Sequence, residues 1–250
     1  MSRLVAAGAA ALLLAPAGPS AAPAAASEPD TGRPEATTAA TAHVLGRSAE
    51  GRRVFAYRVG DPSARRTAVV ISTMHGDERD TVDIVTTLRD GPPVRGLDLW
   101  LVPVYNRDGY AARGRYNSRG VDLNRNYPVE WVRQPASGGR PASERETRIF
   151  MRFLHRVDPD RLVSFHQPLD GVDTSHRKHP AFLRRLSEQL DLPLRRMDCD
   201  GGCHGTMTQW FNRRHDGLAV TVELSADPPR RYLNRRAPRG LLRALGGRRG

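Results

Sequence analysis

The chain has 250 residues, of which 39% are hydrophobic and 26% are charged. This composition is typical of one globular domain, and it excludes a fibrous repeat, a wholly disordered chain and a protein with several membrane spans. Lys and Arg number 39 against 27 Asp and Glu, which gives a formal net charge of +12. That charge permits anionic partners such as nucleic acid, an anionic membrane surface or a cell-wall polymer.

The first 26 residues show the three-part pattern of a secretory signal peptide. Arg3 supplies a positive charge, residues 4–15 form an apolar run, and three alanines at 24–26 fit the cleavage pattern. The run is too short to span a bilayer. We therefore predict a mature protein that is secreted or held in the cell envelope. The predicted organisation is a signal peptide over 1–26, a disordered linker over 27–43, and one folded domain over 44–250 with a basic C-terminal tail.

The rest of the chain alternates short apolar runs with amphipathic segments. Continuous apolar runs predict buried strands, and apolar residues at helical spacing predict helices. Strands are expected at 53–59, 68–72, 99–104, 162–165 and 218–224, and helices at 79–88, 143–157, 180–190 and 241–245. This alternation predicts the α/β class: a three-layer α/β/α sandwich with a mixed, mainly parallel central sheet. The helix at 143–157 is expected to open with a capping box formed by Ser143 and Glu146.

Residues 105–142 form a long segment with Gly, Asn, Pro and Arg but little hydrophobic periodicity. A long irregular segment inside a compact domain is usually functional. Its Arg and Asn side chains are suited to binding an anion, because a guanidinium group can pair with both oxygens of a carboxylate. The alternative is a basic loop that contacts only solvent.

Two histidines and a glutamate follow the ends of predicted strands. His75 and Glu78 come after the second predicted strand, and His166 directly follows the fourth. Two imidazoles and one carboxylate are a standard ligand set for catalytic zinc, with a fourth position left for water. Gly76 permits a tight turn, which would let His75 and Glu78 reach one ion. We therefore predict one Zn²⁺ per chain.

A further carboxylate, Glu223, lies inside the apolar strand at 218–224. Its burial would be costly unless the group is paired or is needed for proton transfer. A carboxylate beside the water position of a zinc site is the expected general base of metal-assisted hydrolysis. The alternative is an ion pair between Glu223 and one of the many arginines.

Cys199 and Cys203 are the only two cysteines. In an exported protein they are expected to form one disulfide that closes a small loop, with Gly201 and Gly202 permitting the turn. A metal site formed by both cysteines and His204 is the alternative.

Four motifs occur together in the order that is found in one enzyme family. They are His75-Gly-Asp-Glu78, Gly120-Val-Asp-Leu-Asn-Arg-Asn126, Ser164-Phe-His166 and Thr221-Val-Glu223-Leu. With these motifs the chain resembles the zinc carboxypeptidase family, the M14 metallopeptidases, over residues 54–224. Within the family it is most similar to the murein peptide amidases, which cut the γ-D-glutamyl–diaminopimelate bond of cell-wall peptides. Asn106-Arg-Asp-Gly109 adds to that similarity.

The resemblance implies the chemistry of the site. His75, Glu78 and His166 would hold zinc. Glu223 would take a proton from water and pass it to the leaving amine, and Arg115 would stabilise the oxyanion together with zinc.

The resemblance also implies how the substrate and one ligand are held. Asn124 and Arg125 would bind the terminal carboxylate of the substrate. Asp122 would orient His75, because a ligating imidazole usually needs a partner on its other nitrogen.

One departure from the family concerns a tyrosine. Larger members carry a mobile tyrosine over the substrate carboxylate, upstream of the glutamate base. Here no tyrosine lies between Tyr127 and Tyr232, and the loop from Cys199 to Cys203 occupies about that place.

These features favour an exported zinc metallopeptidase whose partner is a peptide or a peptidoglycan fragment, cut next to a C-terminal amino acid. One alternative is a general metallocarboxypeptidase or a zinc-dependent deacylase of amino acids. A second is a cell-wall-binding module that has kept the fold and lost the chemistry. Specific nucleic-acid binding is not predicted, because no basic patch is interleaved with aromatic residues. No membrane-spanning segment is predicted in the mature chain.

Overall fold

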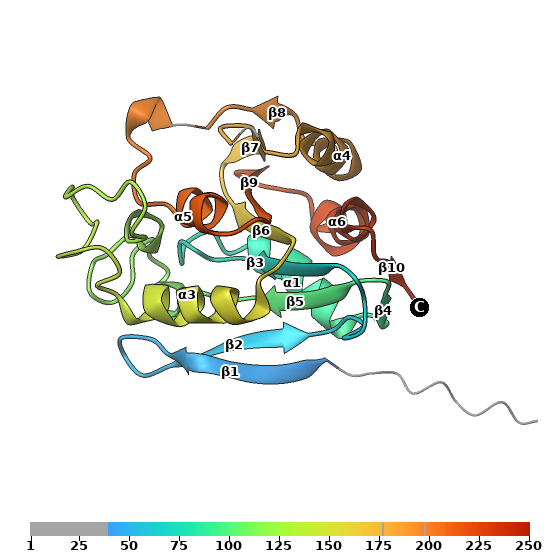
Figure 1. Ribbon diagram of the computed structural model, residues 1–250, viewed down its shortest axis with the longest axis horizontal. Coiled ribbons are helices and arrows are strands. Elements are labelled where there is room, and N and C mark those ends of the chain that lie inside the picture. Colours follow the sequence, from blue (N-terminus) through green and yellow to red (C-terminus); the bar gives the residue numbers. More distant parts are fainter. Residues whose placement is uncertain (1–39, 177, 198) are drawn as a thin grey trace, which may run out of the picture. The chain divides into compact units, whose positions relative to one another are not determined.

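A mixed sheet of eight strands forms the centre of the computed structural model, which describes residues 40–176, 178–197 and 199–250 (Figure 1). The strand order is β1-β2-β5-β3-β6-β9-β7-β8. Strands β5, β3, β6 and β9 run parallel to one another in the middle of the sheet, and β2 and β7 add antiparallel neighbours on either side. The strands are β1 (Thr41–Arg47), β2 (Arg53–Arg58), β3 (Thr67–Ile71), β5 (Asp98–Val102), β6 (Arg161–His166), β7 (Leu169–Asp173), β8 (Leu194–Arg195) and β9 (Leu218–Ser225).

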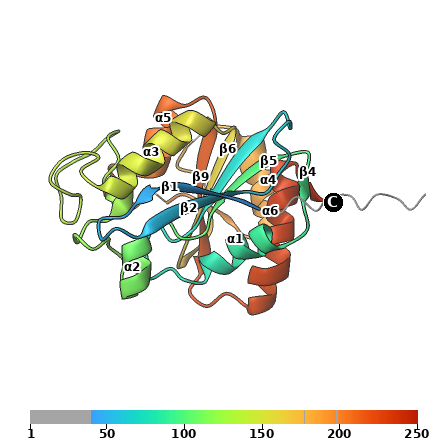
Figure 2. The ribbon, with the colours of Figure 1, turned by 90° about the horizontal axis from the view of Figure 1, so that it is seen from below.

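Helices cover both faces of this sheet. Helices α3 and α5 lie on one face, and α1 and α6 lie on the other (Figure 2). The helices are α1 (Thr81–Asp90), α2 (Arg107–Ala112), α3 (Arg145–Val157), α4 (Pro180–Leu190), α5 (Met207–Arg214) and α6 (Ala237–Leu245). Shorter pieces are η1 (Leu123–Arg125), η2 (Cys199–Gly201) and η3 (Tyr232–Arg236), together with a small ribbon of β4 (Val94–Arg95) and β10 (Arg248–Arg249). The predicted three-layer α/β/α sandwich is confirmed.

Strand β3 shows why the central strands have continuous apolar runs. Ala68 and Val70 pack in one hydrophobic core with side chains of α1, α4 and α6. Val69 and Ile71 pack in the other core with side chains of α3 and α5. Both faces of a parallel strand are covered, so each residue of the run is buried. Burial of one such aliphatic side chain contributes about 1.5–3 kcal/mol.

The predicted capping box of α3 is wrong, although the helix itself forms as expected. The helix begins after Glu144, which makes no side-chain capping bond. The Glu146 carboxylate instead accepts a hydrogen bond from the backbone N–H of Ala49 at 3.0 Å. The Ser143 hydroxyl donates to Glu144 Oε1 at 2.7 Å. A contact with a distant part of the chain therefore replaces the local capping pattern.

The N-terminal boundary of the folded domain differs from the predicted one. Strand β1 begins at Thr41, before the expected start at 44, because Thr41 pairs with Arg58 of β2. The predicted signal peptide, and the predicted linker up to residue 39, lie outside the described residues. None of the helices in the described part of the chain is both long and apolar enough to cross a membrane.

The C-terminal residues are not the solvated basic tail that the sequence suggested. Helix α6 extends the predicted helix at 241–245 back to Ala237 and buries Leu241 and Leu245 against the sheet. Strand β10 then pairs with β4. The arginines of α6 lie on the exposed side of an amphipathic helix, and its apolar residues form the buried side. The high charge of the segment therefore made the buried side difficult to recognise from the sequence.

The segment 105–142 contains the short helix α2, which the sequence did not predict. Asp108 of α2 is buried and joins this helix to the turn between β1 and β2. Its carboxylate accepts hydrogen bonds from Ser48 Oγ at 2.7 Å, from Glu50 N at 3.0 Å and from Arg52 Nη1 at 2.8 Å. Burial raises the pKa of Asp108, but these hydrogen bonds outweigh it, and the pKa lies below its ordinary value.

We expect Asp108→Asn to lower the free energy of unfolding by about 1–3 kcal/mol at pH 7, because the buried Ser48 hydroxyl and the partly buried Glu50 N–H lose a charged acceptor. The folded-state pKa is depressed, so this contribution is present above the ordinary carboxyl pKa of about 4 and is lost as the pH falls through the folded-state value. Urea unfolding at pH 7 and at pH 3 measures both effects. The exposed Asp216→Asn is the control, and equal losses in the two variants would contradict the expectation.

Candidate metal centre

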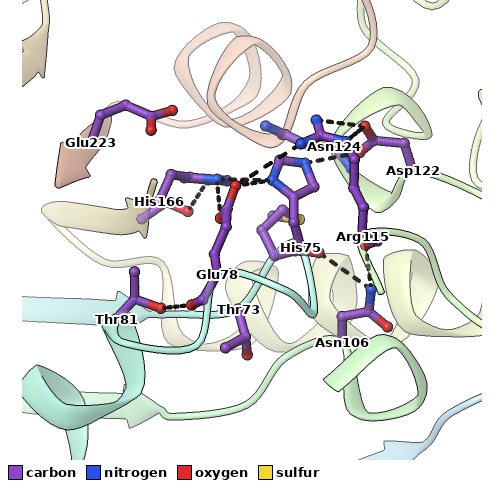
Figure 3. Close-up of polar contacts among 12 residues, drawn as sticks. Thr73, His75, Glu78, Thr81, Asn106, Arg115, Asp122, Asn124, His166 and Glu223 are labelled. Carbon is purple, nitrogen blue, oxygen red and sulfur yellow. Dashed lines mark hydrogen bonds and ion pairs between the residues drawn. The ribbon is translucent and has the colours of Figure 1, made fainter. Parts of the chain in front are cut away.

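The predicted zinc ligands and the predicted base lie at the carboxyl ends of neighbouring parallel strands. His75 and Glu78 follow β3, and His166 is the last residue of β6. Glu223 of β9 lies opposite His166 in the strand register. All four side chains line one cavity of about 750 Å³. Figure 3 shows His75, Glu78 and His166 gathered together, with the carboxyl group of Glu223 across from them.

The three predicted ligands are buried and converge on one point. Their candidate ligand atoms all lie within 4.8 Å of one another. The Nδ1 atoms of His75 and His166 are 3.3 Å apart. Glu78 Oε1 lies 2.5 Å from His75 Nδ1, and Glu78 Oε2 lies 2.9 Å from His166 Nδ1.

The other side of each imidazole is held by a hydrogen-bond partner. His75 Nε2 lies 3.1 Å from Asp122 Oδ1, and His166 Nε2 lies 2.9 Å from Ser164 Oγ. These partners leave both Nδ1 atoms directed at Glu78, whose two carboxylate oxygens lie 2.5 and 2.9 Å from them. Two imidazole nitrogens and a carboxylate that converge in a buried site fit the ligand set of catalytic zinc. The residues present therefore suit a Zn²⁺ ion.

The charges in this cluster favour a cation between the ligands. Burial opposes the charged imidazolium of His75, but Asp122 and Glu78 outweigh it and raise its pKa to about 9. Burial would raise the pKa of Glu78, but the two histidines lower it to about 2. The carboxylates of Glu78 and Asp122 thus favour a positive charge at this point, and a bound divalent cation would supply that charge in place of the proton.

Asp122 connects the candidate ligands to Arg115. Its Oδ1 atom contacts His75 and accepts the backbone N–H of Asn124 at 2.9 Å. Its Oδ2 atom accepts Arg115 Nε and Nη2 at 3.1 and 2.9 Å. Burial acts to raise the pKa of Asp122, yet the hydrogen bond from His75 and the charge of Arg115 hold it well below its usual range. The contact with His75 is the one expected of an orienting carboxylate.

Close backbone packing against α2 shapes the turn that carries His75 and Glu78. A side chain at Gly76 would overlap the backbone of Gly109 and Tyr110, so only glycine fits there. Asn106 caps α2 through Gly109 N at 2.9 Å, and its Nδ2 donates to the Arg115 carbonyl at 3.1 Å. The motif from Asn106 to Gly109 thus anchors both the turn with the ligands and the loop segment that carries Arg115.

Glu223 is buried and makes no ion pair with any arginine in the described ranges. The ion-pair alternative is therefore not what the structure contains. Glu223 Oε2 lies 3.4 Å from Leu169 N. Burial raises the pKa of Glu223, and the charge of Glu78 adds to this increase. A carboxyl group whose proton affinity is raised beside a metal site is suited to proton transfer.

The side chains predicted to bind a carboxylate line the same cavity. Asn124 Oδ1 accepts the backbone N–H of Met207 at 3.0 Å, which leaves the amide N–H groups of Asn124 for another partner. The guanidinium of Arg125 is half-buried. Cys199 and Cys203 also line the cavity, and their sulfurs are bonded to each other rather than arranged around a metal with His204.

Ser164 contacts the candidate ligand His166, a role that the sequence analysis did not assign to it although it stands in the quoted motif. It lies two residues before His166 on β6, so both side chains point to the same face of the strand. The sequence therefore did contain a signal for this contact, namely a hydroxyl side chain two residues before a candidate ligand on a predicted strand.

Comparison with known protein families tests the resemblance. The model of the zinc carboxypeptidase family matches residues 33–169, which is more than half of the chain. The chain belongs to the zinc carboxypeptidase family. His75, Glu78 and His166 lie within the matched range of this family, and Glu223 lies beyond it.

Individual members of the family match smaller parts of the chain. Murein peptide amidase A of Escherichia coli (strain K12) is 30% identical over 151 residues, which cover 53% of this chain and 61% of that protein. Carboxypeptidase A6 of Homo sapiens is 30% identical over 160 residues, which cover 49% of this chain and 37% of that protein. The chain therefore matches about three fifths of the length of the amidase.

Solved structures of zinc carboxypeptidases share the fold. The murein-tripeptide amidase of Escherichia coli O157 aligns with a TM-score of 0.69 and 24% identity, over 86% of this chain and 95% of that chain. The carboxypeptidase A of Helicoverpa armigera aligns with a TM-score of 0.71 and 14% identity, over 83% of this chain and 68% of that chain. These similarities confirm the architecture expected from the sequence.

We expect Asp122→Asn to weaken zinc binding by about 10- to 100-fold, because His75 loses the carboxylate that orients its ring. Competition with a chelator of known affinity at fixed pH measures the change. Asp77→Asn is the matched control, because Asp77 lies between the two ligands in sequence but its side chain is exposed. Equal zinc affinities for the two variants would show that Asp122 does not support the site.

Proposed function

We propose that this protein is an exported zinc metallopeptidase of peptidoglycan stem peptides. In this proposal it hydrolyses the amide bond between γ-D-glutamate and diaminopimelate. The named relatives that support the substrate are murein peptide amidases. The observation that carries the proposal is the arrangement of His75, Glu78 and His166 in one cavity with Glu223 across from them.

His75, Glu78 and His166 would hold the zinc ion. When bound there, zinc supplies a Lewis acid that polarises the scissile carbonyl and lowers the pKa of water. Glu223 removes a proton from the attacking water and delivers it to the nitrogen of the leaving diaminopimelate, which balances the hydrolysis. The raised pKa of Glu223 suits both transfers, because the same carboxyl group must accept and release a proton.

Arg115 is positioned to stabilise the oxyanion. Its Nε and Nη2 atoms are bound to Asp122, which leaves the Nη1 atom, 4.0 Å from Glu78 Oε1, for the substrate. A donor that is held in place before the reaction stabilises developing charge without reorganisation.

Asn124 and Arg125 would bind the free carboxylate of the C-terminal residue. Both line the cavity, and the amide N–H groups of Asn124 are left available by the contact with Met207. A guanidinium and an amide together offer several N–H donors to one carboxylate. This arrangement would select substrates with a free carboxyl terminus.

The test of substrate is hydrolysis of L-Ala-γ-D-Glu-diaminopimelate by the mature, zinc-loaded protein. We expect release of free diaminopimelate, loss of hydrolysis with chelator, and much slower hydrolysis of the same peptide with a carboxamide at its C-terminus. Hydrolysis of peptides with ordinary C-terminal residues, but not of this tripeptide, would replace the proposal with a general metallocarboxypeptidase. Hydrolysis of N-acyl amino acids alone would indicate a deacylase, and a protein that binds no zinc would be a wall-binding module.

Export is the second part of the proposal, and the pattern in residues 1–26 supports it. We expect expression of the full chain in a host with a secretion pathway to give a mature protein that begins near Ser27. Intact mass and N-terminal sequencing of the secreted fraction measure this. An uncleaved chain that stays in the cytoplasm would contradict export without affecting the substrate assignment.

A further inference from the structure

Arg125 is a half-buried cation in the candidate site. It lines the cavity, and it forms no ion pair within the parts of the chain that the structure describes. Its Nη1 atom donates to the Asn124 carbonyl at 2.8 Å and its Nη2 atom faces two sulfur atoms at 3.7 Å, which leaves Nε–H and other N–H groups of the guanidinium for a ligand. Burial lowers the pKa of Arg125, and the nearby charge of Arg115 lowers it further against the opposing effect of Asp122. A half-buried guanidinium that forms no direct ion pair with the described residues favours an anionic ligand.

A disulfide lies against this guanidinium. The bond joins Cys199 and Cys203 across the short turn η2, with the two Cα atoms 5.2 Å apart. Arg125 Nη2 is 3.7 Å from both sulfur atoms. The disulfide therefore bounds one side of the guanidinium, and both cysteines line the same cavity as Arg125.

The chain that follows the disulfide is tied to the segment that carries Arg125. The Tyr127 N–H donates to the Gly205 carbonyl at 2.9 Å, and Gln209 Nε2 donates to the Cys203 carbonyl. Gly205 has a positive φ of 67°, and a Cβ atom there would lie 2.9 Å from the Arg125 carbonyl oxygen. This close approach fixes the distance between the segment that carries Arg125 and the chain that follows Cys203.

On the Cys199 side of the loop, the disulfide acts together with local hydrogen bonds. Met197 N donates to Asp173 Oδ1 at 3.1 Å, and Gly202 N donates to the Cys199 carbonyl at 2.8 Å. Asp200, Gly201 and Gly202 separate the two cysteines, and Gly201 has a positive φ of 82°. Two glycines allow a wide range of backbone conformations once the covalent link between Cys199 and Cys203 is removed. The contact between Nη2 and both sulfurs therefore requires the closed loop.

We propose that the Cys199–Cys203 disulfide is a positioning element for Arg125, which it holds with its remaining N–H groups directed into the cavity for the substrate carboxylate. This inference rests on the proposed function for the identity of the anion. The disulfide does not touch the reacting bond. Its effect is on the pre-organisation of a binding group, which acts on substrate affinity and leaves the chemical step unchanged.

The first experiment replaces the disulfide with the pair Cys199→Ser and Cys203→Ser in the zinc-loaded mature protein. We expect KM for the tripeptide to rise about 3- to 10-fold, the range set by freeing one long side chain, with kcat within 2-fold and one zinc retained per chain. Treatment with the reductant tris(2-carboxyethyl)phosphine should reproduce the change in the wild type and have no effect on the Ser pair.

A double-mutant cycle separates positioning from a general loss of structure. In the Arg125→Ala background the Ser pair should lower kcat/KM by less than 2-fold, because the group that the disulfide positions is absent. An equal loss of kcat/KM with and without Arg125 would overturn the proposal, since the disulfide would then act on the cavity as a whole.

A second measurement requires no substrate. The Nε–H resonance of Arg125, identified by its absence in Arg125→Lys, should have a high ¹⁵N heteronuclear NOE in the wild type and a low one in the Ser pair. Arg58, whose Nε is bound to Asp98 at 2.7 Å, is the reference that should not change. An unchanged NOE for Arg125 would overturn the proposal whatever the substrate is. A lowered NOE in a protein that does not cleave the tripeptide would support the positioning role and contradict the proposed function.

Discussion

Replacing Glu223 with glutamine is expected to lower kcat/KM for the tripeptide by about 10²- to 10⁴-fold, while bound zinc stays near one per chain. The amide has nearly the same shape but cannot accept the proton from water, so the general-base contribution is lost. Zinc is retained because the cluster that fits the ion consists of His75, Glu78 and His166. Steady-state kinetics, with zinc content measured on the same preparation, checks both parts.

The matched control for this substitution is Glu188→Gln on the exposed side of α4. It makes the same chemical change away from the cavity and should leave kcat/KM within 2-fold. Loss of zinc together with activity in Glu223→Gln would mean that Glu223 supports the metal and not the proton transfer. Near-normal activity with zinc bound would remove Glu223 from the mechanism.

Replacing Gly76 with alanine is expected to destabilise the protein by about 3 kcal/mol or more and to abolish zinc binding. The new Cβ atom would overlap the backbone of Gly109 and Tyr110 in α2. The atoms that the new Cβ would meet belong to the backbone, and they cannot rotate away as the end of a flexible side chain can. Either α2 or the turn with His75 and Glu78 must move, and a displacement of about 1 Å is enough to spoil the ligand geometry.

Urea unfolding of the metal-free protein and zinc content together measure the effect of Gly76→Ala. Gly114→Ala is the matched control, because no atom lies within 4 Å of a Cβ at that position. The control should retain one zinc per chain and a free energy of unfolding equal to or slightly above that of the wild type. A stable Gly76→Ala variant with normal zinc binding would show that α2 does not constrain the turn.

The sheet core and the metal cluster were accessible to prediction because both depend on short-range patterns. A run such as Ala68 to Ile71 is apolar at every position, and only a strand covered on both faces buries all of it. Parallel strands end at the same edge of a sheet, so polar residues after two such strands come together. His75 and His166 therefore met as expected, although nothing in their local sequence specifies the 3.3 Å between their Nδ1 atoms.

Elements whose stability comes from distant contacts were missed or misjudged. Glu146 bonds to Ala49, which is far away in sequence, and so the local capping pattern at α3 did not form. Helix α2 is too short to show a hydrophobic period, and the network around Asp108 holds it in place. The arginines of α6 suggested a solvated tail, whereas its leucines complete one of the two cores.

The amino-acid sequence by itself determined the layer architecture, the zinc carboxypeptidase resemblance and the identities of the candidate ligands, because each depends on residue type and spacing along the chain. Only the tertiary structure decided how Asp122 connects His75 to Arg115, and that Arg125 lies against the disulfide with no ion pair to a described acidic residue. These contacts join segments far apart in sequence, so they depend on packing and hydrogen bonds that no local pattern records.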